Sequence, residues 1–472
     1  MADGNLARAA EETLARLGDY ESLWFDGRWL RSGELHERAA RLATGLQERG
    51  IEPGDRVVVQ MPNCPEVGIA YQAIWRAGGV VTPALFLLPQ AELDHIASDS
   101  GAKVVLTAPE ECPELERNEP GEIVPRDAAD PAALLYTGGT TGRSKGVLLS
   151  HENLWFAGKS GHDSGYVPGL VRGLNALPLA HAYGLLVTVV GVHAAEQTRA
   201  VLMRWFDPEL FLQLAQEHRT QITAVVPSML QLLLAQRIER YDLSELRYIV
   251  SGGAPLPRDV AEEVLRRLPH VGFREGYGLT ETAALVSSTP PGESRLGSVG
   301  RPAPGVEVRI DGEEEVGEIC VKSRSVMLGY WNEPELTAET IVDGWLHTGD
   351  LGYLDEDGYL YVVDRKKDLI IRGGFNVFPR DVEEALLEHP AIAAAGVVGR
   401  PDQVHGEEVV AFVEPRPGEE VDAEELVTWS KEKIGGYKYP REVHVVRSVP
   451  LTPVGKVDRK ALRTRMLEEA PA

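Results

Sequence analysis

The sequence has few cysteines and no long uninterrupted apolar run, and each absence excludes a class of protein. The 472-residue chain has three cysteines, Cys64, Cys112 and Cys320. They lie too far apart for a CxxC pair, so we expect neither a disulfide framework nor a zinc site, and a reducing cytoplasm is the simplest location. The longest apolar stretch, Leu177 to Ala195, is interrupted and falls short of the roughly 20 residues that span a bilayer. It is better interpreted as a buried helix. The amino terminus has no basic segment followed by an apolar core, so no signal peptide is expected.

Positive charge is also scarce. The chain has 48 lysines and arginines against 72 acidic residues, a net charge of −24. Such an acidic surface repels a phosphate backbone, so general nucleic-acid binding is disfavoured. The 43% hydrophobic and 25% charged content is typical of globular proteins, and the length suggests about two to four domains.

Strand-like and helix-like patterns alternate through most of the chain. Apolar residues recur at helical spacing from Leu35 to Leu46, a strand pattern covers Arg56 to Met61, and the alternation resumes from Ala132 to about Thr289. This alternation predicts an α/β fold, with layered subdomains around mostly parallel sheets. The stretch 110–130 is rich in Pro, Glu and Asp and predicts a loop.

The last third of the chain changes character. Residues 300–364 contain short strands and turns, which predict a small β subdomain. After Arg365 the patterns predict a separate α+β unit, with helices near 381–388 and 423–433 and strands near 393–398, 409–413 and 442–446. We therefore expect an N-terminal domain of residues 1–365 and a C-terminal domain of residues 366–472.

A glycine- and threonine-rich segment, Thr137 to Lys145, lies between two predicted strands. Its glycines allow close approach to a phosphate, its backbone N–H and hydroxyl groups are donors, and Arg143 and Lys145 supply positive charge. The Walker A pattern GxxxxGK[ST] does not fit this segment. The composition predicts a phosphate-binding loop of another kind.

Residues 136–146 resemble the phosphate loop of the adenylate-forming superfamily, which includes acyl-CoA synthetases, aryl-CoA ligases, luciferases and the adenylation domains of peptide synthetases. Further stretches resemble that family in the same order: LPLAHAYG at 177–184, SGGAPL at 251–256, YGLTET at 277–282, GEICV at 317–321 with GYWN at 329–332, WLHTGD at 345–350, DRKKD at 364–368 with GGFN at 373–376, and PVGKVDR at 453–459. The resemblance covers nearly the whole chain. It implies a large N-terminal α/β domain with a small β subdomain, followed by a small, mobile α+β C-terminal lid.

The implied reaction needs a phosphate cradle, a divalent metal and a movable cation. A carboxylate attacks the α-phosphate of ATP and expels pyrophosphate, and the barrier is mostly electrostatic because two anions must meet. The resemblance places ATP and AMP on a set of residues in three regions: Thr137, Gly138, Gly139, Thr140, Thr141, Gly142 and Lys145 in the loop, Gly252, Gly253, Ala254, Tyr277 and Gly278 around the adenine, and Asp350 and Arg365 on the ribose.

The resemblance also implies the catalytic residues. Glu281 matches the carboxylate that holds Mg²⁺, a cation that prefers oxygen ligands, and Thr280 matches the residue at the α-phosphate. Lys456 matches the catalytic lysine of adenylation, and Lys367 matches the hinge about which the lid turns. Gly373 and Gly374 match the loop that lines the CoA pantetheine tunnel. CoA then displaces AMP and gives a thioester.

The acyl pocket is expected at His181, Tyr183, Gly184 and Met229, where His181 orients the substrate carboxylate. The segments 183–192 and 225–234 carry no charged residue. A second charge on the substrate would be buried without a partner there, whereas each buried methylene adds about 0.8 kcal/mol. We therefore expect medium-chain fatty acids, with aryl acids as the alternative, in a cytoplasmic monomer or homodimer.

Several other functions remain open at this point. A peptide-synthetase adenylation domain is disfavoured because LAHAY has no acid for an α-ammonium group, and a fatty acyl-AMP ligase because no insertion is apparent. A luciferase-like oxygenase shares the adenylation motifs. A non-catalytic nucleotide-binding scaffold fits poorly with intact Lys456, Glu281 and Asp350.

Overall fold

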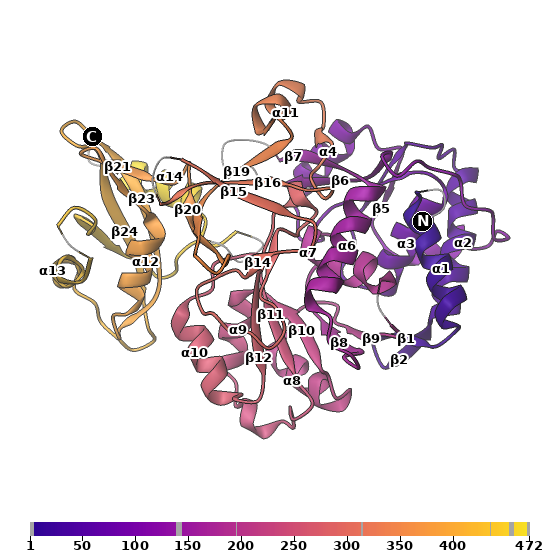
Figure 1. The fold of residues 1–472 in the computed structure, drawn as a ribbon, viewed down its shortest axis with the longest axis horizontal. Helices are drawn as coiled ribbons and strands as arrows, with labels where there is room; N and C mark the ends of the chain where they lie inside the picture. Colours follow the sequence, from indigo (N-terminus) through magenta and orange to yellow (C-terminus); the bar gives the residue numbers. More distant parts are fainter. Residues whose placement is uncertain are drawn as a thin grey trace. The chain divides into compact units, whose positions relative to one another are not determined.

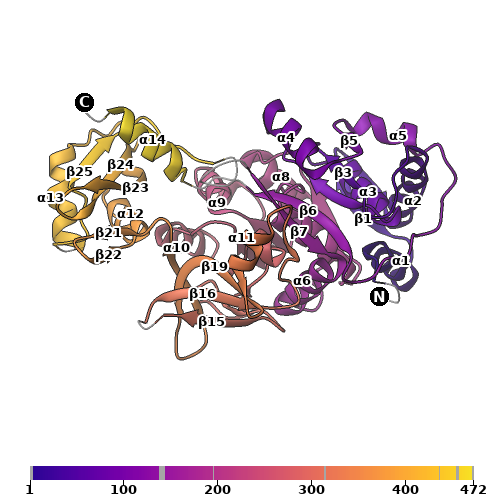
Figure 2. The same cartoon turned by 90° about the horizontal axis from the view of Figure 1, so that it is seen from above.

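The computed structural model describes residues 4–137, 144–194, 196–312, 315–434, 436–452 and 457–469. The chain forms two compact units (Figures 1 and 2). The N-terminal unit comprises Met1–Val308, Val321–His347 and Gly358–Leu360, and the C-terminal unit comprises Arg309–Cys320, Thr348–Asp357 and Tyr361–Ala472. The expected α/β fold class is confirmed, and the domain boundary expected after Arg365 stays a prediction.

A nine-stranded sheet lies in the N-terminal unit, with the order β14-β13-β12-β11-β10-β8-β9-β1-β2. Its strands are β1 (Glu21–Phe25), β2 (Arg28–Arg31), β8 (Arg172–Asn175), β9 (Arg199–Leu202), β10 (Ile222–Val225), β11 (Tyr248–Ser251), β12 (Gly272–Tyr277), β13 (Ser287–Ser288) and β14 (Arg301–Pro302). The run from β12 to β1 is parallel, as the alternating pattern predicted.

Three helices cover one face of this sheet (Figure 1). They are α8 (Pro208–Glu217), α9 (Pro227–Leu234) and α10 (Arg258–Arg267). Their apolar sides, including Phe211, Leu230 and Val264, pack with Val225 and Phe273 of the strands in one buried cluster. Burial of this apolar area from water holds the helices on the sheet.

A second, six-stranded sheet has the order β17-β7-β6-β4-β3-β5. Its strands are β3 (Arg56–Val59), β4 (Val80–Pro83), β5 (Val104–Leu106), β6 (Pro131–Thr137), β7 (Lys145–Ser150) and β17 (Gly329–Tyr330). The helices of this region are α1 (Leu6–Leu17), α2 (Ser32–Glu48), α3 (Pro65–Arg76), α4 (Gln90–Ser100), α5 (Cys112–Leu115) and α6 (His151–Gly165).

The loop predicted at 110–130 is wrong at its start, because η1 (Pro109–Glu111) and α5 form there. Buried Cys112 and Leu115 give this turn an apolar side.

The apolar stretch 177–195 is not the single helix that its composition predicted. It forms α7 (Ala182–Leu185), a π-helical turn η2 (Leu186–Val190) and a 3₁₀ turn η3 (Gly191–His193). Asn63 secures the start of this stretch: its side-chain amide donates to Leu177 O at 2.9 Å and Met203 O at 3.1 Å, and its carbonyl accepts from Leu179 N at 2.9 Å. π-Helical turns are common at functional sites. No helix in the described ranges is long and apolar enough to cross a membrane.

A third sheet has the order β15-β16-β19-β18 with β20 paired to β19, and its strands are divided between the two units. Its elements are β15 (Glu307–Asp311), β16 (Gly317–Lys322), β18 (Ile341–Val342), β19 (Trp345–Leu354) and β20 (Leu360–Arg365), with α11 (Pro334–Thr340) between β17 and β18. Short turns η4 (Ile238–Arg240) and η5 (Thr280–Thr282) complete the N-terminal unit.

The C-terminal unit is built on a sheet of order β22-β21-β24-β23, with β25 parallel to β24. Its elements are β21 (Ile370–Arg372), β22 (Phe375–Val377), α12 (Pro379–Leu387), β23 (Ile392–Asp402), β24 (Gly406–Pro415), α13 (Ala423–Ile434), β25 (Glu442–Val445) and α14 (Arg459–Glu469). Successive residues of β24 face opposite sides, as a strand requires. Val409 and Ala411 join the cluster with Leu386 of α12, whereas Val410 and Phe412 join the cluster with Leu462 of α14.

All three cysteines are buried and free. Burial raises the pKa of Cys64 and of Cys112 to about 12, and it also raises the pKa of Cys320. The thiolate, which is the reactive form, is therefore scarce at neutral pH.

We predict that Asn63→Ala destabilises the N-terminal unit. The substitution leaves two carbonyls and one N–H group without their partner in a buried position, so we expect a loss of about 2–4 kcal/mol. Urea unfolding followed by tryptophan fluorescence measures it. The matched control is Asn118→Ala, because the Asn118 amide makes a single 3.4 Å bond to Leu115 O. An unfolding midpoint equal to that of the wild type would contradict the role of Asn63.

Candidate active site

The phosphate-binding segment is placed by a pair of antiparallel strands. β6 ends at Thr137 and β7 begins at Lys145, and these two residues pair with each other. The pairing brings the first and last expected loop residues side by side. Gly138, Gly139, Thr140, Thr141 and Gly142 lie outside the described residues.

One face of α4 holds both stems of this segment. Tyr136, before the loop, donates its hydroxyl to Asp99 at 2.6 Å. Ser144, after the loop, donates its hydroxyl to Glu92, and its carbonyl lies 3.3 Å from His95 Nε2. The acids and the histidine are spaced three and four residues apart, so they share one helix face. These contacts were not predicted from the sequence, although the spacing is visible in it.

Glu281 lies on η5, directly after β12. Its carboxylate accepts a hydrogen bond from the Tyr330 hydroxyl at 2.8 Å, and its backbone carbonyl accepts from Met327 N at 2.8 Å. Lys145 Nζ lies 6.0 Å from the centre of the Tyr330 ring. The structure thus brings Lys145 and Glu281 together around Tyr330, a residue that the sequence analysis had not assigned to the site.

The backbone after η5 is strained. Ala283 and Ala284 have φ of +49° and +70°, values that non-glycine residues seldom adopt. Such residues persist where the surrounding structure fixes them, and they gather at functional sites. Thr280 and Glu281 therefore sit on a turn whose shape is imposed by its neighbours.

The expected adenine residues lie at the ends of two adjacent parallel strands. Gly252, Gly253 and Ala254 follow β11, Tyr277 ends β12, and Gly278 follows it. Parallel strands bring their carboxyl ends to one edge of a sheet, where ligands of α/β proteins bind. A Cβ atom at Gly278 would lie 2.2 Å from Ala284 O, so only glycine fits there.

The expected acyl residues lie against this edge. His181 caps α7, and its Nδ1 accepts from Tyr183 N at 3.3 Å. A Cβ atom at Gly184 would lie 2.1 Å from Pro178 O, which requires glycine. The Tyr183 ring lies 3.4 Å from the position of a Cβ atom at Gly252, so the acyl and adenine residues meet here. Met229 on α9 packs partly against the apolar cluster of the nine-stranded sheet.

A buried cation lies near Tyr183. Arg274 is 3% exposed and donates to Thr289 O at 2.6 Å, Ser164 O at 3.2 Å and Ser288 Oγ at 3.0 Å. Burial raises the pKa of Tyr183, and the charge of Arg274 opposes part of that rise. The acyl segments themselves are uncharged, but their surroundings include this guanidinium.

The expected ribose residues meet in the C-terminal unit. Asp350 on β19 is buried, and its Oδ1 lies 3.3 Å from Arg365 Nε at the end of β20. Lys367 follows two residues later. Gly373 and Gly374 form the two-residue turn between β21 and β22, with φ of +58° and +83°. Two positive φ values are what a tight hairpin of this kind needs. Lys456 lies outside the described residues.

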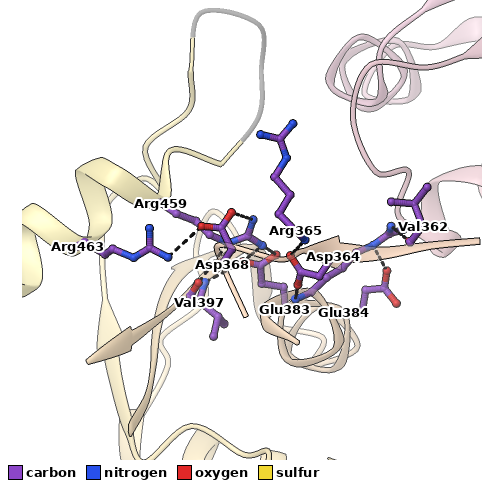
Figure 3. Close-up of polar contacts among 10 residues, drawn as sticks. Val362, Asp364, Arg365, Asp368, Glu383, Glu384, Val397, Arg459 and Arg463 are labelled. Atoms are coloured by element: carbon purple, nitrogen blue, oxygen red, sulfur yellow. Dashed lines mark hydrogen bonds and ion pairs between the residues drawn. The ribbon is translucent and has the colours of Figure 1, made fainter. Parts of the chain in front are cut away.

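Five charged residues form a cluster that includes both acids of the segment around the expected hinge, Lys367, and is called the hinge ion cluster: Asp364, Asp368, Glu383, Arg459 and Arg463. Figure 3 shows Arg459 pointing between the acids. Its guanidinium donates to both oxygens of Glu383, at 2.9 and 2.8 Å, and lies 3.6 Å from Asp368 Oδ2. Arg463 donates to the other oxygen of Asp368 at 2.9 Å. The cluster therefore ties residues 364–368 to α12 and to the start of α14.

Backbone donors complete the cluster. Asp364 accepts from Arg365 N at 2.7 Å and from Arg380 N at 2.8 Å, and Glu383 also accepts from Val397 N at 2.8 Å. Burial raises the pKa of Asp364, and it raises the pKa of Glu383 to about 7 against the opposing charge of Arg459. A carboxyl with such a pKa changes its charge near neutral pH.

The comparisons with known proteins agree with the motifs. Residues 10–331 match the model of the AMP-binding enzyme family, and residues 381–456 match that of the AMP-binding enzyme C-terminal domain. A feruloyl-CoA synthase from Amycolatopsis is 38% identical, over 93% of this chain and 94% of that protein. A long-chain-fatty-acid–CoA ligase from Bacillus subtilis is 33% identical, over 97% of this chain and 93% of that protein. The solved structure of O-succinylbenzoate CoA synthetase from Bacillus subtilis, in complex with ATP and magnesium ion, is 30% identical, with a TM-score of 0.86 over 97% and 99% of the two chains.

We predict a pH-dependent stability that Glu383→Gln removes. The folded carboxyl binds its proton more tightly than the unfolded one, whose pKa is about 4.5, so the folded state holds more protons between about pH 4.5 and 7. The free energy of unfolding therefore falls as the pH rises through this window, by roughly 2–3 kcal/mol. Unfolding of the wild type and the variant, measured by urea titration at pH 5, 6, 7 and 8, gives the difference.

The matched control is Glu384→Gln, one residue along α12. Glu384 is exposed and accepts from Arg380 Nε at 2.7 Å. This variant should keep the pH dependence of the wild type. If Glu383→Gln and Glu384→Gln show the same dependence, the proton is bound elsewhere.

Proposed function

The chain belongs to the AMP-binding enzyme family and is an acid–thiol ligase of the AMP-forming type, and we propose that it joins a carboxylic acid to CoA through an acyl adenylate. The observation that supports this most directly is the group of Lys145, Glu281 and Tyr330 beside the paired ends of β6 and β7. It brings a cation and a carboxylate to one place, as a triphosphate with its metal requires.

Glu281 and Thr280 would hold Mg²⁺ and the α-phosphate. Both offer oxygen ligands, and within the described part of the chain Glu281 Oε2 has no protein donor, which fits a magnesium ligand. The ion would neutralise charge that builds up on the phosphate oxygens. Asp350 would accept from the ribose hydroxyls, and Arg365, whose Nε lies 3.3 Å from Asp350 Oδ1, would orient that carboxylate.

The two steps would use different parts of the C-terminal unit. Lys456 would assist the approach of the substrate carboxylate to the α-phosphate, a step in which two anions meet. Gly373 and Gly374 would line the path of the CoA pantetheine arm in the second step, after a rotation about Lys367. The hinge ion cluster supports this division, because it makes the segment around Lys367 and the start of α14 one packed body.

We propose a neutral acid with an apolar tail, medium-chain fatty acids first. The support is the absence of charge in the segments 183–192 and 225–234 and the packing of Met229 on an apolar cluster. Aryl acids are the second candidate, because the feruloyl-CoA synthase is 38% identical to this chain. The thiol acceptor is CoA or the pantetheine of a carrier protein.

We predict that Lys456→Ala loses the first step alone. Pyrophosphate release from acid and ATP should fall by about 1,000-fold, because the lysine is needed while the two anions approach. A synthetic acyl adenylate with CoA should still give thioester at a near-normal rate. Coupled pyrophosphate detection and chromatography of the thioester measure the two steps.

Lys367→Pro should have the opposite effect and lose the second step alone. Proline fixes φ and restricts rotation, so this variant should release pyrophosphate and fail to form thioester. Normal pyrophosphate release by Lys456→Ala would refute the role of that lysine. Equal loss of both steps in a folded Lys367→Pro protein would refute the hinge.

We predict that kcat/KM rises from acetate to octanoate. Octanoate has about six more methylenes than acetate, and burial of about four of them gives about 3 kcal/mol, or roughly a hundredfold in binding. A panel of acetate, octanoate, benzoate, cinnamate, malonate and alanine, scored for pyrophosphate with and without CoA, tests this. A preference for benzoate or cinnamate selects the aryl acid, and a preference for malonate, whose second carboxylate would need a cation such as Arg274, rules out the neutral pocket.

A further inference from the structure

Tyr330 is held in a fixed register beside the phosphate-binding segment. It lies on β17, pairs with Val147 of β7, and is followed by Trp331, whose backbone N–H donates to Gly146 O at 2.8 Å. Its own N–H donates to Thr337 Oγ1 at 2.9 Å. Because the backbone is bonded on both sides, the direction of the Tyr330 side chain is set by strand pairing.

The side chain of Tyr330 has a carboxylate at its hydroxyl and an ammonium group near its ring. Its hydroxyl donates to Glu281 Oε1 at 2.8 Å, and its ring centre lies 6.0 Å from Lys145 Nζ. Among the described residues Lys145 and Glu281 form no ion pair with each other, although both lie near the Tyr330 side chain.

We propose that Tyr330 is a positioning residue for metal-bound nucleotide: its hydroxyl orients the Glu281 carboxylate, and its ring keeps that carboxylate from pairing with Lys145. The inference rests on the proposed function. One Glu281 oxygen is occupied by the hydroxyl, which leaves the other for Mg²⁺. The Lys145 ammonium group stays available to bind the phosphates, because an ammonium group already paired with a carboxylate would first have to break that ion pair.

The hydroxyl and the ring have separable effects. Tyr330→Phe keeps the ring and removes the one hydrogen bond to Glu281, so the carboxylate loses orientation while Lys145 stays unpaired. The metal-dependent part of ATP binding should weaken by about tenfold, the usual effect of a hydrogen bond to a charged group. ATP binding in EDTA should not change, because the phosphates then meet only Lys145 and the loop.

The test is a binding experiment that does not depend on turnover. ATP affinity is measured by isothermal titration calorimetry in excess MgCl₂ and in EDTA, for the wild type, Tyr330→Phe, Glu281→Gln and the double variant. In the Glu281→Gln background Tyr330→Phe should have no further effect, since the partner of the hydroxyl is already changed. A full tenfold loss in that background, or an equal loss in EDTA, would overturn the proposal, as would no loss in either condition.

Tyr166→Phe is the matched control. The Tyr166 hydroxyl also donates to a glutamate, Glu196, at 2.7 Å, but it lies at the exposed end of α6. This variant should bind ATP as the wild type does in both conditions. If the wild type itself binds no ATP and releases no pyrophosphate with any acid, the proposed function fails; if the wild type binds and Tyr330→Phe behaves like Tyr166→Phe, only the role of Tyr330 fails.

Discussion

The pairing of β6, β7 and β17 is the constraint on which the candidate nucleotide site depends. Thr137 and Lys145 face each other because β6 and β7 are antiparallel in that register. β17 adds Tyr330 beside them, and Tyr330 in turn holds Glu281. A shift of β7 by one residue would turn Lys145 to the other face of the sheet, because side chains alternate along a strand. The buried residues of β7, Val147, Leu149 and Ser150, oppose such a shift.

The sequence predicted the fold class and most elements, because both are encoded locally. Periodicity placed the helix at 35–46 and the strand at 56–61, which the structure has as α2 and β3. The structure adds a steric requirement for glycine that the sequence had not indicated, since Gly278 and Gly184 tolerate no Cβ atom. The stretch 177–195 was misjudged, because apolar composition says nothing about a change from α to π turns within one segment.

Contacts between distant segments could not be predicted in this way. Tyr330 and Glu281 are 49 residues apart, and Arg459 and Glu383 are 76 apart. Each pair meets only after the sheets have assembled, so no local pattern marks it. The hinge ion cluster is a further example of contacts between distant segments. Asp364, Asp368 and Glu383 are all buried, and their charges are tolerated because arginines and backbone N–H groups surround them.

All three cysteines are buried, so the protein presents no native thiol at its surface. Cys64, Cys112 and Cys320 are at most 1% exposed, and their thiols resist deprotonation. A cysteine introduced at Leu87 (79% exposed) and another at Val404 (83% exposed) would then be the two thiols that a maleimide dye reaches. One dye would then lie in each unit, so a dye pair could be attached across the two units without first removing a native cysteine.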